Sequence, residues 1–262
     1  MKLSKLQRKH HHEAESLLSL SRKLNEEERH FCLDHWIPGA TGDVGIHGVF
    51  FTPREIAEGI AYYPHEGPVI DACAGIGRLA FHCWLASKWS NHPRFSLTCV
   101  EFNTTYYEVG RRILPEAEWI RADLTDYAAS LGGKRPFREA IANPPYGKAP
   151  TLREWRGYSG PAHLVAAAVL GDITTSGGWM LLPETDIDQS FNRFSREDSA
   201  VYQKFRSARP DLTLTHYSHD FSEHRSKWLG AAPNVTLADL NIELPAAKPR
   251  SLFELRQYRR SA

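Results

Sequence analysis

The sequence lacks a long apolar run. No hydrophobic stretch approaches the roughly 20 residues that a membrane-spanning helix needs, and the first residues, Met-Lys-Leu-Ser-Lys, have no apolar core of the kind found in a signal peptide. An excess of charge of one sign is also missing, because 32 lysines and arginines face 31 aspartates and glutamates. This balance excludes a histone-like polycation and an acidic disordered chain. We therefore expect a soluble, cytoplasmic protein.

The sequence is also poor in patterns that bind metal or form disulfides. Its four cysteines, at positions 32, 73, 83 and 99, form no Cys-x-x-Cys pair and are expected to be reduced residues of the core or of turns. Three consecutive histidines, His10 to His12, would point in different directions on a helix, so we expect them on a solvated surface. The other histidines and the carboxylates lack the spacing of a ligand set. No metal site is expected.

What the sequence does contain is an alternation of short apolar runs and helical segments. With 262 residues, 42% of them hydrophobic, the chain can bury a sizeable core. Strand-like runs lie at 69–71, 95–100, 119–120, 140–142, 178–182, 212–217 and 234–242, and helical segments at 54–62, 78–88, 104–113 and 162–172. This alternation predicts an α/β fold with a mainly parallel sheet.

Three parts are expected along the chain. Residues 1–45 are polar and rich in helix formers, with a partial leucine stripe, and should form a helical N-terminal extension that packs on the main domain. Residues 46–245 should form the α/β domain. Residues 246–262, with five basic side chains and one acidic one, should form a basic C-terminal tail.

A glycine loop follows the first predicted strand, in the segment Asp-Ala-Cys-Ala-Gly-Ile-Gly at 71–77. Gly75 and Gly77 allow a tight turn and a close approach of the backbone to a ligand. Together with Ala80 they also match the dinucleotide fingerprint, which is a weak signal by itself. Asp71 ends the strand and can pair with an ammonium group, which S-adenosylmethionine carries and NAD lacks.

Two further carboxylates end or follow the next predicted strands. Glu101 ends the second strand, where a carboxylate can accept hydrogen bonds from both hydroxyls of a ribose. Asp123 follows the third and is placed to accept a hydrogen bond from an adenine amino group. The order of these residues predicts a site for an adenosine-containing cofactor.

The segment Asn143-Pro144-Pro145-Tyr146 directly follows the predicted strand at 140–142. Two successive prolines hold the backbone stiffly, so the Asn143 side chain and the Pro144 carbonyl keep a defined relation. Both can accept the protons of one planar NH2 group, drawing it toward tetrahedral geometry and releasing its lone pair. Tyr146 offers a flat face on which a base can stack, an interaction worth roughly 1–3 kcal/mol.

These residues together resemble the S-adenosylmethionine-dependent amino-methyltransferases, specifically the N6-adenine DNA methyltransferases with the gamma-type motif order. In that family a Phe/Tyr-Thr-Pro segment precedes the glycine loop, as Phe51-Thr52-Pro53 does here. The resemblance covers about residues 46–185. It implies a Rossmann-like methyltransferase fold, with a mainly parallel seven-stranded sheet and helices on both faces, and S-adenosylmethionine as cofactor.

The resemblance also implies roles for single residues. The cofactor would be held by Phe51, Thr52, Pro53, Asp71, Ala72, Gly75, Gly77, Glu101, Phe102, Asp123, Leu124 and Asn143. The target base would be held at the catalytic residues Asn143, Pro144, Pro145 and Tyr146. The implied reaction is in-line transfer of the sulfonium methyl group to the adenine N6 atom, with the adenine flipped out of the duplex.

The chain departs from the family in its C-terminal part. Only 77 residues follow position 185, too few for the separate recognition domain of members that read long sequences. We therefore expect short or relaxed sequence specificity, or a partner chain that supplies it. A restriction-modification, phage or mobile-element setting would suit a compact stand-alone enzyme. Basic runs at 134–156 and 193–209 are compatible with a nucleic-acid surface. The candidate phosphate contacts are Lys148, Arg153, Arg156, Arg193 and Arg196.

Several alternatives stay open from the sequence. Glutamine N5-methyltransferases also use Asn-Pro-Pro-Tyr, because a glutamine amide presents the same planar NH2 group; the segment 51–53 favours DNA over this substrate. RNA adenine is also possible, since no residue is identified that reads the 2′-hydroxyl. A non-catalytic cofactor-binding subunit would not need the intact Asn143 and Tyr146. A NAD-dependent oxidoreductase would leave the Asn-Pro-Pro-Tyr segment and Asp71 unexplained.

Overall fold

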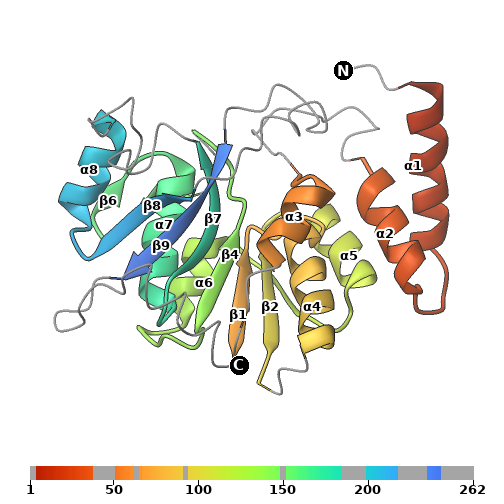
Figure 1. Cartoon of the computed structure of the whole chain (residues 1–262), viewed down its shortest axis with the longest axis horizontal. Helices are drawn as coiled ribbons and strands as arrows, with labels where there is room; N and C mark the ends of the chain where they lie inside the picture. The colour runs from red at the N-terminus through yellow and green to blue at the C-terminus, as the bar shows by residue number, and fades with distance from the viewer. Residues whose placement is uncertain are drawn as a thin grey trace, which may run out of the picture.

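The structure is a computed structural model that describes residues 4–37, 51–61, 65, 67–90, 94–147, 152–183, 199–217 and 235–242. A twisted sheet lies in the middle of the molecule with helices on both faces (Figure 1). Helices α3, α4 and α5 cover one face, and α6, α7 and α8 cover the other. The two N-terminal helices lie outermost, beside α5. The helices cover both faces, so the central strands β1, β2 and β4 are largely buried, whereas the edge strand β3 is only half-covered.

Seven strands form the sheet in the order β3-β2-β1-β4-β7-β9-β8. The strands are β1 (Pro68–Ala72), β2 (Ser96–Glu101), β3 (Glu118–Arg121), β4 (Glu139–Ala142), β7 (Gly178–Pro183), β8 (Leu212–Tyr217) and β9 (Val235–Ile242). Neighbouring strands are parallel from β3 to β7, whereas β9 runs antiparallel to both β7 and β8. This confirms the predicted fold class, a mainly parallel seven-stranded α/β sheet.

In the described part of the chain, six helices pack against the sheet. They are α3 (Arg54–Ala61), α4 (Arg78–Ser90), α5 (Thr104–Ile113), α6 (Leu124–Ser130), α7 (Ala162–Ile173) and α8 (Ala200–Ala208). Successive residues of a strand point to opposite faces of the sheet. Val69 belongs to the hydrophobic cluster on the α4 side, and Ile70 to the cluster on the α7 side. Helix α7 is buried almost all round, which explains its run of alanine, valine and leucine.

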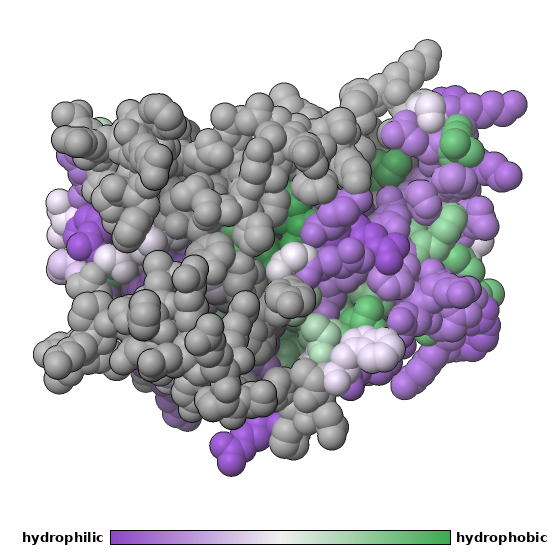
Figure 2. Space-filling view, in the orientation of Figure 1, coloured by the Kyte–Doolittle hydropathy of each residue, from purple (hydrophilic) through white to green (hydrophobic). Residues whose placement is uncertain are grey.

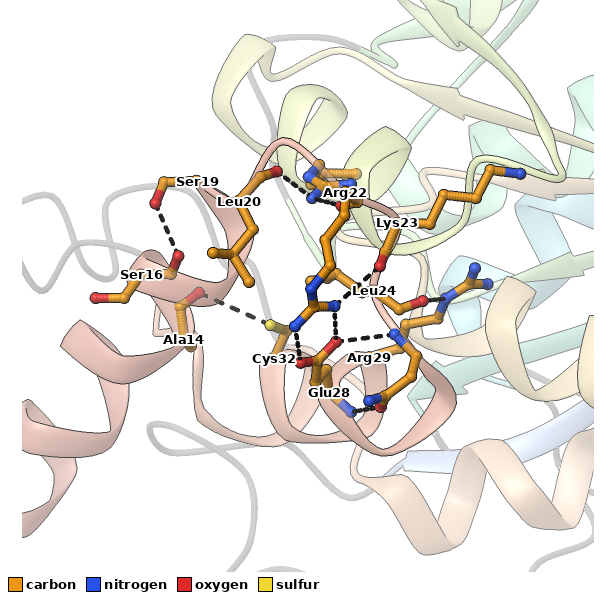
Figure 3. A network of polar contacts seen from close by, with 12 residues as sticks. Ala14, Ser16, Ser19, Leu20, Arg22, Lys23, Leu24, Glu28, Arg29 and Cys32 are labelled. Atoms are coloured by element: carbon orange, nitrogen blue, oxygen red, sulfur yellow. Dashed lines mark hydrogen bonds and ion pairs between the residues drawn. The ribbon is translucent and has the colours of Figure 1, made fainter.

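Two helices, α1 (Lys5–Leu18) and α2 (Glu26–His35), form the N-terminal hairpin (Figure 3). Capping boxes start both helices, and in the second Asn25 and Glu28 bond each other's backbone N–H. The hairpin is tied to the rest of the chain by Arg29, whose guanidinium meets Glu116 at 2.8 and 3.0 Å. Arg112 of α5 donates to the backbone carbonyl of Leu18 at the end of α1 and to those of Leu20 and Arg22 in the connection between the two helices. The outer side of this region is mostly hydrophilic (Figure 2).

Two histidines of the triplet differ from the expectation of a solvated surface, since His10 is half-buried against the rings of Phe31 and His35, and His11 is covered more fully. His11 is buried, accepts a hydrogen bond from the Ile37 N–H at 3.2 Å, and lies 3.3 Å from Glu15. The end of α2 and the residues after it cover this side of α1, a tertiary contact that helical spacing does not reveal. His12 is exposed as expected. Among the described residues, no three metal-ligating side chains cluster, and no helix is long and apolar enough to cross a membrane.

A small hairpin of β5 (Glu154–Trp155) and β6 (Tyr158–Ser159) precedes α7 and was not expected from the sequence. Its two-residue turn has positive φ at both Arg156 and Gly157, the backbone of a tight hairpin turn. The hairpin packs between α7 and α8, since Tyr158 contacts Phe205 edge to face.

The sheet order reverses between β1 and β4. From β1 the chain continues to β2 on one side, whereas from β4 it continues to β7 on the other. In open parallel sheets, ligands bind outside the carboxyl ends of the strands at such a point. The glycine loop and the Asn-Pro-Pro-Tyr segment leave the sheet from these two carboxyl ends.

Candidate active site at the carboxyl edge of the sheet

The glycine loop is a close-packed turn in which both predicted glycines have positive φ, +57° at Gly75 and +85° at Gly77. A side chain at Gly75 would place its Cβ 2.8 Å from the Phe51 ring. At Gly77, the Cβ would lie 3.1 Å from the Trp119 indole, which also covers Gly110 of α5. Glycine is therefore required at Gly75 and Gly77 both by backbone conformation and by the aromatic rings that press on the loop.

Asp71 supports this loop from below. Its carboxylate accepts a hydrogen bond from the Ala80 N–H at 3.0 Å, and so caps one of the free donors in the first turn of α4. The second carboxylate oxygen is buried and has no hydrogen-bond partner among the described residues. Burial raises the pKa of Asp71 well above its ordinary value. The neighbouring Ala72 is fully buried at the end of β1.

Glu101 connects the glycine loop with the end of β2. One carboxylate oxygen accepts the Gly75 N–H at 2.7 Å, and the other accepts the Asn103 N–H at the same distance. Burial raises the pKa of Glu101 to about 7, against the opposing effect of these N–H donors. The carboxylate predicted for a ribose thus lies directly against the loop predicted for the cofactor.

A surface hollow of about 570 Å³ opens beside Glu101. It is lined by Phe102, Asn103, Thr104, Thr105, Arg121, Ala122 and Asp123. The Phe102 ring is 60% exposed at this hollow, although large apolar side chains are usually covered. Asp123 caps α6 by accepting the Thr125 N–H at 2.8 Å. The side chain of Leu124 is buried in the core, which leaves only its backbone for a ligand.

The Asn-Pro-Pro-Tyr segment is held from two sides. The Asn143 amide nitrogen donates to the Thr52 hydroxyl at 3.0 Å, and the Tyr146 hydroxyl donates to the Asn143 oxygen at 2.6 Å. Pro144 is buried and Pro145 half-buried, which keeps the segment fixed at the end of β4. Burial raises the pKa of the Tyr146 hydroxyl far above its ordinary value, so this group stays a donor.

The segment at 51–53 lies between the two loops. Phe51 packs on Gly75, and Thr52 contacts Asn143 from a position 91 residues earlier in the chain. Pro53 is buried and its carbonyl accepts the first helical hydrogen bond of α3, from Ala57. The structure thus brings together three segments that the sequence separates, which are the segment at 51–53, the glycine loop and the Asn-Pro-Pro-Tyr loop.

The candidate phosphate contacts are less closely gathered. Arg153 is exposed, but Arg156 lies 3.4 Å from Asp172, near the last residue of α7. The Asn-Pro-Pro-Tyr loop is joined to the first residue of α7, where Ala162 donates to Gly147 at 2.7 Å. The twelve residues of α7, about 18 Å of helix, separate these two points. Lys148, Arg193 and Arg196 lie outside the described residues.

Two residues at the site were not predicted. Arg78 follows the glycine loop, and its guanidinium donates to the Thr52 carbonyl at 3.0 Å. His163 is buried, accepts the Gly147 N–H at the end of the Asn-Pro-Pro-Tyr loop at 3.3 Å, and contacts the Tyr146 ring edge to face. Arg78 could have been suspected, because it is a charged residue that directly follows the glycine loop. His163 gave no signal in the sequence.

Comparison with known proteins shows the fold. No family model and no curated protein matches the sequence. A Listeria monocytogenes protein, provisionally assigned as a class I S-adenosylmethionine-dependent methyltransferase, matches with a TM-score of 0.63 and 13% identity, over 95% of this chain and 84% of that chain. The chain therefore has the Rossmann-like fold of the class I methyltransferases.

Two other solved structures match with lower scores. A type I restriction-modification methyltransferase subunit from Streptococcus thermophilus has a TM-score of 0.48 and 16% identity, over 77% of this chain and 46% of that one. A protein from Pyrococcus horikoshii, provisionally assigned as an RNA methyltransferase, has a TM-score of 0.47 and 16% identity, over 88% of this chain and 97% of that chain.

Proposed function

We propose that this protein transfers a methyl group from S-adenosylmethionine to the N6 amino group of adenine in DNA, with short or relaxed sequence specificity. The observation that carries the proposal is the hydrogen bond between Thr52 and Asn143, beside the contact of Phe51 with Gly75. It joins the segment that favours a DNA substrate to both the cofactor loop and the catalytic loop.

The residues present fit the proposed cofactor. Glu101 offers a buried carboxylate for the ribose hydroxyls, and the hollow beside it presents the exposed ring of Phe102 and the carboxylate of Asp123 to an adenine. The buried oxygen of Asp71 that has no partner among the described residues suits an ammonium group. When bound, S-adenosylmethionine supplies a methyl group that the positive sulfonium already activates.

The chain's own contribution is to position the amine that accepts the methyl group. The Asn143 oxygen accepts a hydrogen bond from Tyr146, and because an amide oxygen can accept two hydrogen bonds, it is the atom proposed to accept a proton of the substrate amine. The Pro144 carbonyl supplies the second acceptor. Because Thr52 holds the nitrogen end of the amide, the oxygen end is the one presented to the substrate. Holding the reactants in line supplies most of the rate in a transfer of this kind.

The test uses the purified protein, methyl-labelled S-adenosylmethionine and unmethylated genomic DNA, followed by digestion and identification of labelled nucleosides. Label in N6-methyldeoxyadenosine supports the proposal, and sequencing the modified sites gives the specificity. Label found only in RNA, or in a glutamine of a protein, would keep the chemistry and replace the substrate.

The Asn143→Ala variant separates catalysis from binding. It should still bind S-adenosylhomocysteine by calorimetry but lose methyl transfer by at least 100-fold. Transfer that persists in this variant would remove Asn143 from the reaction. A wild-type protein that binds the cofactor and methylates none of the three substrates would favour a subunit that acts with a partner chain, which could also supply sequence specificity.

A further inference from the structure

Arg78 is a cation built into the wall of the candidate cofactor site. It is the first residue of α4, directly after the glycine loop. Its side chain turns toward the segment at 51–53, where the guanidinium lies 5.5 Å from the centre of the Phe51 ring. One guanidinium nitrogen donates to the Thr52 carbonyl at 3.0 Å. A neutral carbonyl and an aromatic face are thus its close contacts.

No carboxylate pairs with this cation within the described part of the chain. Asp34 is the acidic residue whose charge acts on Arg78, but its carboxylate is directed to Arg54, at 3.5 Å. The Nε atom of Arg78 is buried and has no hydrogen-bond partner among the described residues. Burial lowers the pKa of Arg78 to about 10, so the group remains charged at neutral pH. Arg78 is half-buried, but a buried donor that lacks a hydrogen-bond partner is unfavourable, and a bound anion would satisfy it.

The surroundings of Arg78 favour an anion further. Helix α4 begins at this residue, and the N–H groups of its first turn add positive potential. One of these N–H groups, that of Ala80, already donates to the Asp71 carboxylate. Phe51 and Thr52 are only 8% and 3% exposed, so the anion must be small enough to enter beside them.

We propose that Arg78 binds the α-carboxylate of the methionine part of S-adenosylmethionine, an assignment that rests on the proposed function. A guanidinium offers a carboxylate parallel N–H donors in a planar fork, and its Nε is the donor left over here. The glycine loop and the Phe51 segment, which are expected to hold the methionine part, are the two segments that Arg78 joins. No residue has been given this role so far.

The test compares two ligands by calorimetry with the full chain: S-adenosylmethionine and its decarboxylated analogue. Wild-type protein should bind S-adenosylmethionine at least tenfold more tightly than the analogue. The Arg78→Met variant should lose this preference, binding both ligands about as well as wild-type protein binds the analogue. The matched control is Arg54→Met, a nearby exposed arginine on α3, which should keep the preference.

Other outcomes overturn the assignment. If Arg78→Met lowers the affinity for both ligands equally, the arginine only supports the structure of the loop. If neither affinity changes, Arg78 has no role in binding. If Arg78→Met fails to fold, Arg78→Gln and Arg78→Lys are measured in the same way, and a full preference in the glutamine variant contradicts the proposal. Wild-type protein that binds neither ligand contradicts the proposed function itself, a result distinct from equal binding of both.

Discussion

At the scale of single residues, the proposed function depends on the orientation of one amide, that of Asn143. An asparagine side chain has an accepting end and a donating end, and only the oxygen end can bind the protons of a substrate NH2 group. Thr52 binds the nitrogen end of Asn143 while Tyr146 binds the oxygen end. In the proposed reaction Thr52 is therefore a positioning residue for the Asn-Pro-Pro-Tyr loop, besides any contact with the cofactor.

Replacing Thr52 by valine keeps the shape and removes the hydroxyl. Loss of a buried hydrogen bond costs about 1–2 kcal/mol, so we expect kcat to fall roughly tenfold. The affinity for S-adenosylhomocysteine should change little, and Thr52→Ser should restore most of the rate. Steady-state kinetics and calorimetry on the three proteins check this. A loss of affinity with unchanged kcat would place Thr52 in cofactor binding alone.

Glu101 predicts how cofactor binding depends on pH. Its pKa of about 7 means that the carboxyl is largely protonated at pH 6 and ionised at pH 8. Only the ionised form accepts bonds from both ribose hydroxyls, so affinity should rise by about tenfold between these pH values. Titration of S-adenosylhomocysteine from pH 6 to 8.5 measures this. The Glu101→Gln variant should bind S-adenosylhomocysteine more weakly, with an affinity that does not change with pH. If the variant keeps the pH dependence of wild type, another group causes it.

At the scale of elements, α4 carries much of the site and joins it to the N-terminal hairpin. Its first turn receives the Asp71 cap, and its buried face presents His82 to His30 of α2 and to Phe81. Burial lowers the pKa of His82 to about 4 and also lowers that of His30. These imidazoles are therefore held neutral between two helices.

This interface should make the protein sensitive to acid. The unfolded chain binds a proton at His82 near pH 6.5, whereas the folded chain resists it down to about pH 4. Stability is thus present above pH 6.5 and falls as the pH drops toward 4, by about 3 kcal/mol for this residue. Urea unfolding at pH 7.5 and pH 4.5 should show a smaller loss in His82→Gln than in wild type. His12→Gln, at an exposed position, is the control and should lose as much as wild type.

At the scale of the whole molecule, the sequence predicted the parallel sheet well because its buried strands are short apolar runs between helices. It missed α6, since Asp123 was interpreted as a ligand contact and not as a helix cap. It also missed the β5–β6 hairpin, whose turn places Arg156 where asparagine is usual. Motif order predicted which loops belong together. It did not predict Arg78 or His163, because their roles depend on contacts between distant segments.

A ligand that binds the folded chain should stabilise the whole molecule. At a concentration 100 times its dissociation constant, S-adenosylhomocysteine adds about 2.7 kcal/mol, which corresponds to a rise in Tm of roughly 5–10 °C for a chain of this size. Thermal unfolding with increasing ligand measures the rise. NAD at the same concentrations should give no shift, and a shift with NAD alone would favour an oxidoreductase.

The indole of Trp119 has a consequence for how this sequence can change. It presses on Gly77 in the loop and on Gly110 in α5, where an added Cβ would overlap the ring. Substitutions at Gly77, Gly110 and Trp119 are therefore expected to depend on one another, although only Gly77 belongs to a recognisable motif. Among distant relatives, a smaller residue at position 119 should accompany any larger residue at 110. A search for important glycines by motif alone would overlook Gly110.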